Sequence, residues 1–474
     1  MRWLVLLLIA LAPLGASAKD ASISMMYSNA TDGALPFELV RSGSWSASSD
    51  ARFVKLHLYF DEPVEISAVE IDACEKPPFP QFSVWLNFDE ARLAGTDTDE
   101  QSYAARVGLE GRTFYARAFP AGTEARSLTW NFERWRGVKL CALRVLDEAG
   151  KPYTLRVPEL APGAVQASST LAPAAAYEVL HLFDSRYEYA WASAGQSTGV
   201  QLRFRFDAAR SVTRLRIWNG YQRSGTHCLA NARPRRLQLS GDGGYSAVVE
   251  VADRLGSQVL ELPQPFNGRE LAIDVADAYP GRDYKDLVIS ELRFGNADGW
   301  FTLDPSPMLQ AAARANRAQL ARAGLERMLG EGFEEWSEGN TTSYESVLRL
   351  RADGSFYLSG IGQTEPGEKP TDDEADTARR YFTLGNYEVK ESDAKGLRLR
   401  VFGLYYETDA YGDCNGCGRD CNRAYDTARG RIFEEYVRIR VTRPGDPELR
   451  VVLENESGGR KLPFRSIELE RAVR

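Results

Sequence analysis

The chain has 474 residues, of which 43% are hydrophobic and 26% are charged, and its formal net charge at pH 7 is −8. This length predicts about three domains of ordinary size, and the hydrophobic content is sufficient for their cores. An acidic chain without a basic tail argues against nucleic acid, and against an anionic membrane surface, as the main partner.

The first eighteen residues have the pattern of a secretory signal peptide. Arg2 precedes an apolar run from Trp3 to Ala12, and Ala16-Ser17-Ala18 follows as a small-residue cleavage site. The apolar run is too short for a membrane anchor, and no later segment is long and apolar enough to be one. We therefore expect residues 1–18 to be removed, leaving a secreted or periplasmic protein without a transmembrane segment.

Residues 19–163 are expected to form the first of two related β-sandwiches. When residues 45–71 are laid over residues 191–217 without a gap, Trp45 falls on Trp191. Apolar positions of the intervening strand patterns coincide as well, which indicates an internal repeat. A Pro162-Gly163 pair is the expected boundary between the two copies.

Residues 164–300 are expected to form the second sandwich. From Val200 to Phe206 apolar and polar residues alternate, so that Gln201, Arg203 and Arg205 share the polar face of a half-buried strand. Similar short runs recur through residue 275 and are interrupted by turn residues. Short strands at this spacing are typical of a sandwich.

A helix is predicted within the segment 301–330, over residues 308–330. Ala, Leu, Arg and Gln dominate it, Ser306 is a candidate cap, and Gly330 is a candidate terminator. We expect its apolar stripe to pack on a neighbouring domain. The stripe consists of Leu309, Ala312, Leu320, Leu325 and Leu329.

Residues 331–474 return to alternating strand patterns, for example at residues 348–351, 397–401 and 437–441. About six or seven strands are expected, as an antiparallel β-barrel or a sandwich. The predicted fold class is therefore mainly β: tandem jelly-roll sandwiches, a connecting helix and a C-terminal β domain.

The six cysteines point to disulfides, because an exported protein meets oxidising conditions. Cys74 and Cys141 are the two cysteines of the first sandwich, and we expect them to be bonded to each other. The other four allow two readings. Oxidising surroundings favour disulfides, one of which would tie the middle region to a Cys-rich loop, over a metal site of four thiolates. These four are Cys228, Cys414, Cys417 and Cys421.

A group of short signatures in the middle region carries a family resemblance. They are Ala167-Ser168-Ser169, Asp184, Trp191, Asn219-Gly220-Tyr221, Asn231-x-Arg233 and the segment from Tyr279 to Phe294. Together they resemble the discoidin (coagulation-factor or F5/8 type C) family, and more narrowly its glycan-binding branch in the translocation domain of secreted NAD glycohydrolases. The resemblance implies a jelly roll whose loops at one end bind carbohydrate or another surface ligand. It does not imply NAD hydrolysis, because the catalytic domain of those proteins is a separate unit.

The signature residues suit sugar binding on physical grounds. Flat aromatic rings stack on the apolar faces of a sugar, and Asn and Arg side chains bond its hydroxyls. The expected ligand contacts are Trp218, Asn219, Tyr221, Asn231 and Arg233.

Three further residues of this region have alternative roles. Asp184 and Trp191 are interpreted chiefly as supports of the first loop, with ligand contact as the alternative. Glu291 occupies the position where some discoidin relatives place a structural calcium ligand. We expect no other cofactor.

An enzymatic function is disfavoured. The three histidines all lie outside the C-terminal domain, and the doublet Glu434-Glu435 on a strand would point to opposite faces. We therefore favour an exported, non-catalytic protein that binds a glycan or a cell-envelope polymer. The alternatives are a secreted hydrolase with its active site in the C-terminal β domain, and a protein-binding adhesion or structural component.

Overall fold

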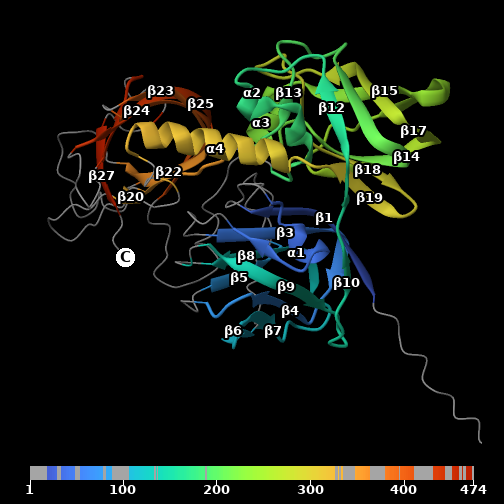
Figure 1. Cartoon of the computed structure of the whole chain (residues 1–474), viewed down its shortest axis with the longest axis horizontal. Coiled ribbons are helices and arrows are strands. Elements are labelled where there is room, and N and C mark those ends of the chain that lie inside the picture. The colour runs from blue at the N-terminus through green and yellow to red at the C-terminus, as the bar shows by residue number, and fades with distance from the viewer. Residues whose placement is uncertain are drawn as a thin grey trace, which may run out of the picture.

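The computed structural model describes residues 19–28, 34–47, 54–77, 82–87, 106–132, 135, 137–186, 189–325, 329, 333–334, 347–362, 379–393, 396–409, 431–442, 451–457, 462 and 466–471. These residues form two β-sandwiches and a closed β-barrel, with one long helix running between the barrel and the sandwiches (Figure 1). The mainly β fold class predicted from the sequence is therefore confirmed.

The first sandwich consists of two five-stranded sheets around one apolar core. One sheet has β10 (Thr154–Arg156), β1 (Asp20–Ser28), β3 (Val54–Glu65), β8 (Glu124–Phe132) and β5 (Phe82–Leu86), in this order. The other has β2 (Trp45–Ser46), β9 (Lys139–Leu146), β4 (Ala68–Ala73), β7 (Thr113–Arg117) and β6 (Arg106–Glu110). A short helix, α1 (Glu38–Arg41), precedes β2.

The position of His57, on β3, differs from the one that the strand pattern predicts. The alternation of residues along the strand predicts that the His57 side chain faces solvent, but the imidazole is buried. Its Nδ1 lies 2.8 Å from Thr129 Oγ1, and the ring stacks on Tyr27. Both faces of this part of β3 are therefore covered, which alternation along one strand does not reveal.

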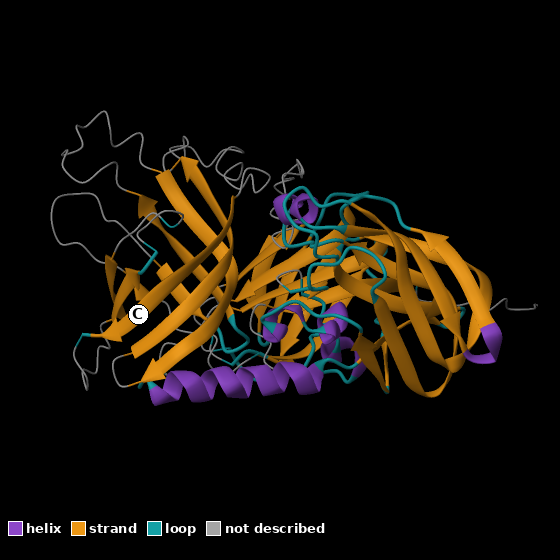
Figure 2. Ribbon diagram, turned by 90° about the horizontal axis from the view of Figure 1, so that it is seen from above, coloured by secondary structure: helices purple, strands orange, loops and turns teal. Residues whose placement is uncertain are grey.

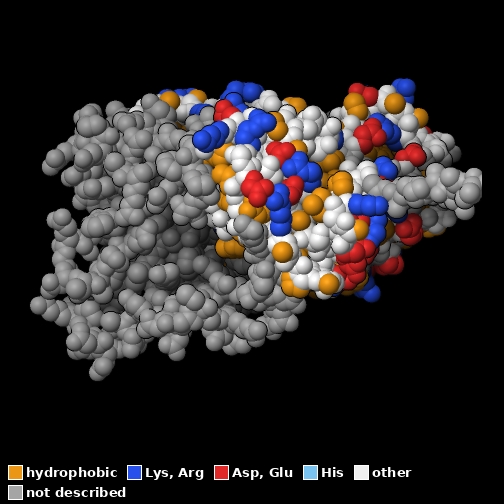
Figure 3. All heavy atoms as spheres, turned by 90° about the horizontal axis from the view of Figure 1, so that it is seen from below, with side chains coloured by type: hydrophobic (Ala, Val, Ile, Leu, Met, Phe, Trp, Pro, Cys, Tyr) orange, Lys and Arg blue, Asp and Glu red, His pale blue; other side chains and the backbone are white. Residues whose placement is uncertain are grey.

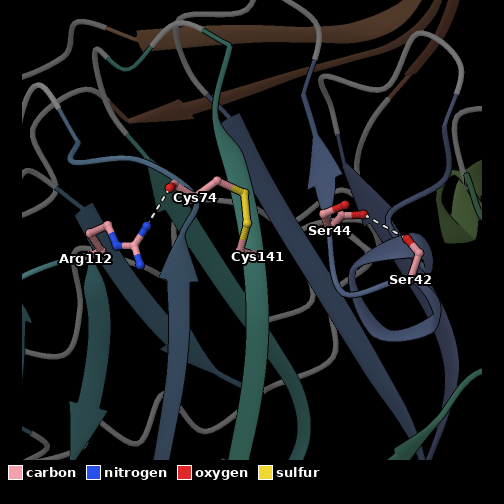
Figure 4. The surroundings of a disulfide bond; sticks show 5 residues. All are labelled: Ser42, Ser44, Cys74, Arg112 and Cys141. Atoms are coloured by element: carbon pink, nitrogen blue, oxygen red, sulfur yellow. Dashed lines mark hydrogen bonds between the residues drawn. A yellow bond between two sulfur atoms is a disulfide. The ribbon is translucent and has the colours of Figure 1, made fainter.

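The disulfide between Cys74 and Cys141 joins the end of β4 to the neighbouring strand β9 (Figure 4). The bond closes a loop across 67 positions of the sequence. The Cys74 carbonyl also accepts a hydrogen bond from Arg112 Nη1 at 2.7 Å. The pairing predicted from the sequence is confirmed.

The middle sandwich is built on two long strands that pass through both of its layers. β14 pairs with β17 on both sides of a register shift between Arg205 and Arg210, so the sheet continues from one layer into the other around a single core. The path of paired strands is β11 (Glu159–Ala161), β19 (Gly299–Leu303), β18 (Val288–Asn296), β14 (Gln201–Asn219), β17 (Ser257–Tyr279), β15 (Arg233–Gly241) and β16 (Tyr245–Glu250). β12 (Gly163–Ala167) pairs with β14, and β13 (Trp191–Ala192) with β18.

Four short helical turns complete this sandwich. They are α2 (Ala174–Tyr177), η1 (Val179–Phe183), α3 (Gly225–Ala230) and η2 (Asp242–Gly244). In Figure 1, α2 and α3 lie at the end of the sandwich that is directed toward the barrel.

The two sandwiches share the arrangement around their aligned tryptophans. Trp45 lies on a two-residue strand that pairs with β9, and Trp191 lies on a two-residue strand that pairs with β18. Both indoles are buried, and each N–H donates to a backbone carbonyl, that of Ala34 at 3.0 Å and that of Ser169 at 3.1 Å. This correspondence supports the internal repeat.

The pairing of the short strands moves the boundary between the sandwiches. β10 pairs with β1 of the first sandwich, whereas β11 pairs with β19 of the second. The chain therefore crosses over at residues 157–158, a few residues before the expected Pro162-Gly163. At its other end the middle sandwich extends to Leu303 because β19 belongs to its sheet.

The connecting helix α4 (Ser306–Arg322) lies beside the barrel and reaches back to the sandwiches (Figure 2). Leu309 packs in the core of the first sandwich, whereas Ala313 and Leu320 pack in the core of the barrel. The predicted docking role is confirmed, with Ala313 in place of Ala312. The helix ends earlier than expected because Gly324 adopts a left-handed φ of +68°.

None of the helices in the described part of the chain combines the length and the apolar character that a membrane crossing requires. The expected terminator Gly330 lies outside the described residues.

The C-terminal domain is a closed antiparallel barrel, so the barrel alternative is correct. Leu397, Leu399 and Val401 of β24 pack in its core, while the alternating Arg398 and Arg400 form ion pairs outside that core. Its strands are β20 (Phe333–Glu334), β21 (Val347–Leu350), β22 (Ser355–Gly362), β23 (Arg379–Asp393), β24 (Gly396–Asp409), β25 (Arg431–Val441), β26 (Val451–Asn455) and β27 (Ser466–Arg471), which pairs back with β20.

Charges of both signs are mixed on the described surface. On the face that Figure 3 shows, basic and acidic side chains lie next to one another. In the first sandwich, for example, Arg144 binds Asp72 at 2.7 Å and Glu70 at 3.0 Å. Such pairing compensates the positive charge of Arg144 locally.

Candidate ligand-binding site

The structure brings the five residues expected to contact a ligand together at one end of the middle sandwich. Trp218 and Asn219 end β14, Tyr221 follows in the next loop, Asn231 ends α3, and Arg233 begins β15. All five are buried, with exposed fractions between 0% and 8%. Their expected role as an open sugar-binding surface is therefore not met in this arrangement.

Hydrogen bonds and packing within the protein explain the burial of the first two residues. Asn219 Nδ2 donates to the carbonyls of Pro234 and Ala252, at 3.0 and 3.1 Å. The Trp218 ring packs against Met25 of the first sandwich, with the Arg293 guanidinium 5.6 Å from the ring centroid. Trp218 thus belongs to the contact between the two sandwiches and offers no free face for a sugar.

The side chain of Arg233 is held by an ion pair and two carbonyl oxygens. Its Nε donates to Asp253 Oδ1 at 2.6 Å, and its Nη1 donates to the carbonyls of Cys228 and Asn231 at 2.8 and 2.7 Å. Hydrogen bonding to Asp253 raises the pKa of the guanidinium further above its usual value. Asn231 Nδ2 in turn donates to the carbonyl of His227 at 2.8 Å. Both polar residues therefore hold the loop that contains α3.

Tyr221 fills a small apolar cluster beneath this loop. It packs with Ala190, Ala192 and Val288, and the Arg223 guanidinium lies 4.8 Å from its ring centroid. A buried aromatic ring with such contacts contributes to stability through packing. It is not available as a stacking platform.

Asp184 and Trp191 both lie inside the protein, and their role as supports of the first loop stays a prediction. Asp184 Oδ2 lies 2.7 Å from His181 Nδ1, and Asp184 Oδ1 accepts a hydrogen bond from the backbone N–H of Arg186 at 2.9 Å. Trp191 is fully buried. Desolvation lowers the pKa of His181 to about 4. This cluster fixes the turn that follows η1.

Glu291 is not arranged as a calcium ligand. Its carboxylate accepts the backbone N–H of Arg186 at 2.9 Å and binds Arg293 Nη1 at 2.7 Å. Burial raises the pKa of this carboxyl well above its usual value, although Arg293 opposes the shift. Within the described residues, no group of three or more His, Cys, Asp or Glu side chains gathers where a metal ion could be held. The expected calcium ligand is instead an internal partner of arginine.

The barrel covers this end of the middle sandwich. Arg186 Nη1 binds Asp353 of the barrel at 2.6 Å, with both side chains at least 95% buried. The hydroxyl of Tyr189 donates to the Asp353 carbonyl at 2.6 Å, and Arg223 donates to the side chain of Asn386. We call these contacts the junction. Of the predicted site residues, Tyr221 lies next to the junction, because the Arg223 guanidinium packs over its ring.

Cys228 lies at the same end of the sandwich and is a free, buried thiol, so its expected disulfide is not formed. Burial raises the pKa of this thiol to about 11, which keeps it protonated at neutral pH. The helix α3 holds it beneath the loop, near Gly220 and Arg233. Cys414, Cys417 and Cys421 lie outside the described residues.

A second region of the middle sandwich is open to solvent. The strands β12, β14, β17 and β15 form a cleft of about 680 Å³ on the face of the sheet that is turned away from the core. Small residues keep part of its floor low: Ala272 and Ser240 lie in register on β17 and β15, and Ala164, on β12, lies beside Arg205. Gly241 allows the close approach of β15 to β17, since an added Cβ would meet the Glu270 carbonyl at 2.6 Å.

Polar side chains of both signs line this cleft. Arg203 and Arg205 project from β14, and Arg205 lies in register with Glu270 on β17. Gln201 donates to Asp274 at 2.7 Å and accepts a hydrogen bond from Arg203 Nε, which orders one wall. The cleft can therefore donate and accept hydrogen bonds at an accessible surface.

Sequence reasoning missed the cleft although it identified part of its lining. The alternation from Val200 to Phe206 placed Gln201, Arg203 and Arg205 on one polar face. A polar strand face is ordinarily solvated surface, and the hollow depends on the small residues of three other strands.

The middle sandwich matches a known family. Residues 159–295 match the model of the NAD glycohydrolase translocation F5/8 type C domain. The match begins with β11 and ends in β18, so it spans nearly the whole sandwich. The middle sandwich is thus a discoidin domain of this branch, in agreement with the resemblance seen in its sequence. No curated protein matches the chain.

Solved structures of low identity are also similar to the chain. One is the family 32 carbohydrate-binding module of Clostridium perfringens NanJ in complex with galactose (15% identity, 28% of this chain, 92% of that chain, TM-score 0.23). Another is the CBM32-1 and CBM32-2 pair of Clostridium perfringens ZmpB in complex with GalNAc (9% identity, 59% and 90%, TM-score 0.22). A third is the allantoicase of Saccharomyces cerevisiae (10% identity, 55% and 81%, TM-score 0.22).

Proposed function

We propose that this protein is exported and binds carbohydrate, either a free glycan or a polymer of the cell envelope, through its middle sandwich. The observation that carries the proposal is the match of residues 159–295 to the F5/8 type C family model. The accessible polar cleft on the same sandwich supports it, because sugar hydroxyls require donors and acceptors at a concave surface.

The other two domains act, in this proposal, as a frame for the middle sandwich. On one side, Asp61 of the first sandwich accepts hydrogen bonds from Arg216 and from Trp300 Nε1, the latter at 3.1 Å. On the other side, the junction with Asp353 joins the barrel to the same sandwich. A rigid frame lowers the entropic cost of presenting a binding surface.

The state of the histidines supports a binding protein over an enzyme. His57, His181 and His227 are all buried, and each has a hydrogen-bonding partner inside the protein. A catalytic base must reach its substrate within hydrogen-bonding distance. Glu434 and Glu435 are separated as well, since Glu434 pairs with Arg400 while the buried Glu435 accepts a hydrogen bond from Asn455.

Export is supported by two independent features. Residues 1–18 have the pattern of a signal peptide. The bond between Cys74 and Cys141 is of a kind that persists in oxidising compartments and is rare in the cytosol.

A glycan array tests the proposal. The full chain from residue 19, shown to be folded by a cooperative thermal transition, is applied to neutral, uronate-containing and sulfated oligosaccharides and to isolated envelope polysaccharides. We expect saturable binding to one class and no release of reducing ends on prolonged incubation. A folded chain that binds none of these carbohydrates contradicts the proposal, and release of reducing ends favours a hydrolase.

A further inference from the structure

We propose that the cleft formed by β12, β14, β17 and β15 is the carbohydrate site, and that its ligand is a neutral, hydroxyl-rich oligosaccharide held by hydrogen bonds rather than by aromatic stacking. This inference rests on the proposed function, to which it adds a location and a ligand class. The first supporting observation is accessibility: Arg203, Arg205 and Glu270 are exposed, whereas the residues of the family signatures are buried.

The charges of the cleft favour a neutral ligand. The lining contains two guanidinium groups, those of Arg203 and Arg205, and two carboxylates, those of Asp242 and Glu270. An anionic sugar in the cleft would gain attraction from the arginines but would meet repulsion from the carboxylates. Hydrogen bonds from the backbone N–H groups of Arg269 and Glu270 lower the pKa of Asp242, which favours its anionic form further. The balance leaves little net preference for either sign.

The hydrogen-bonding capacity of the cleft fits hydroxyl groups. Arg205 and Glu270 lie opposite each other in register, yet among the described residues neither side chain has an ion pair or a side-chain hydrogen bond. The guanidinium offers five N–H donors, and the carboxylate accepts from two hydroxyls at once. Neighbouring hydroxyls of a sugar ring both donate and accept, so one ring between these two groups would use both capacities.

The shape of the cleft favours a short chain of sugars over a peptide. The cleft spans four strands, which corresponds to about 14 Å between the outer two at ordinary strand spacing. Its floor is the face of a sheet whose backbone groups are already paired between strands, so an extended peptide cannot add there as a further strand. Phe204 is the aromatic residue in the lining, and its ring packs inward in the core. Recognition in the cleft therefore depends on polar groups.

A double variant tests this site in the full chain from residue 19. Arg205→Gln with Glu270→Gln removes both unengaged groups without changing the net charge. The matched control is Arg236→Gln with Glu250→Gln, which makes the same changes at exposed positions that lie in register on β15 and β16, outside the cleft. Affinity is measured by calorimetric titration with the neutral oligosaccharide that binds best in the array. We expect at least about tenfold weaker binding for the cleft variant and no change for the control.

A second variant tests the shape of the cleft and leaves its charged residues unchanged. Ala272→Trp fills the centre of the cleft from an outward position on β17, and we expect it also to weaken binding by at least about tenfold. Thermal unfolding shows whether each variant is folded.

The results of these experiments distinguish an error in the proposed site from an error in the proposed function. If the wild-type chain binds a neutral oligosaccharide and both folded cleft variants bind it equally well, the site is wrong while the proposed function stands. If the wild-type chain prefers uronate-containing or sulfated sugars, the neutral ligand class is wrong. If the wild-type chain binds no carbohydrate, the proposed function itself fails.

Discussion

The middle sandwich presents two arginine-rich regions with opposite environments. Arg186 and Arg223 are buried in the junction and Arg233 is buried at the same end of the sandwich, whereas Arg203 and Arg205 are exposed in the cleft. A buried guanidinium must be paired because desolvation of an uncompensated charge is costly. An exposed guanidinium keeps its donors for a ligand. The same residue type therefore stabilises the assembly of domains in one region and remains available for recognition in the other.

The signature motifs belong to the first of these regions. Gly220, in the Asn-Gly-Tyr triplet, has a φ of +77°, and an added Cβ would lie 2.7 Å from Arg233 Cδ and 3.0 Å from Cys228 Sγ. Glycine is therefore required for Arg233 to pass beside the loop. In this chain the triplet and the Asn-x-Arg motif are two parts of one packing arrangement.

The largest expected effect is a loss of unfolding free energy on substitution of an arginine in the junction, compared with the same substitution in the cleft. Arg186→Met leaves Asp353 buried without its partner, and removal of one member of a buried ion pair costs about 3–5 kcal/mol. Urea unfolding of the full chain measures this loss. The matched change Arg205→Met in the cleft is expected to stay within about 0.5 kcal/mol. Equal effects of the two substitutions would show that the junction does not stabilise the molecule.

The substitution Tyr221→Ala tests whether the buried end of the middle sandwich contributes to stability and not to ligand binding. Truncation of a buried aromatic ring is expected to cost about 3 kcal/mol of unfolding free energy. The oligosaccharide affinity of the folded fraction is expected to remain unchanged, because the cleft lies elsewhere on the sandwich. The measurement pairs urea unfolding with calorimetric titration. Loss of binding with unchanged stability would instead place the ligand at Tyr221.

Removal of the disulfide tests whether the first sandwich takes part in binding. Cys74→Ala with Cys141→Ala releases a loop of 67 positions and is expected to cost about 2–4 kcal/mol. We expect the affinity for oligosaccharide to stay the same in the folded variant. A large loss of affinity in that variant would mean that the first sandwich contributes to the site.

Part of the pH dependence of stability near pH 6 is expected to arise at the junction end. Burial, together with Arg223, lowers the pKa of His227 well below 6.5, so the folded state stays unprotonated while the unfolded state gains a proton below that pH. Stability therefore falls as pH falls below about 6.5. In the His227→Gln variant, the slope of the unfolding free energy against pH below pH 6.5 should decrease by about 1 kcal/mol per pH unit. The Arg205→Gln variant should keep the wild-type slope, and a His227→Gln slope equal to that of wild type would count against a neutral His227.

Short-range patterns were sufficient to predict much of this molecule. Period-two alternation predicted the strands. The expected export and the presence of two cysteines in the first sandwich predicted the bond between Cys74 and Cys141. The grouped signatures indicated the discoidin family. The partner of Arg186 could not be predicted, because Asp353 lies in another domain and nothing local marks the pair. The cleft was missed for a related reason, since its depth depends on the pairing that places Ala272 beside Arg203 of β14 and Ser240 beside Ala272.

The most direct test of the account is a crystal structure of the full chain with its best-binding neutral oligosaccharide. We expect the sugar to lie across β12, β14, β17 and β15 in contact with Arg205 and Glu270, with the contact between Arg186 and Asp353 intact. A sugar bound at Tyr221 and Arg233, with the barrel displaced from the middle sandwich, would contradict it.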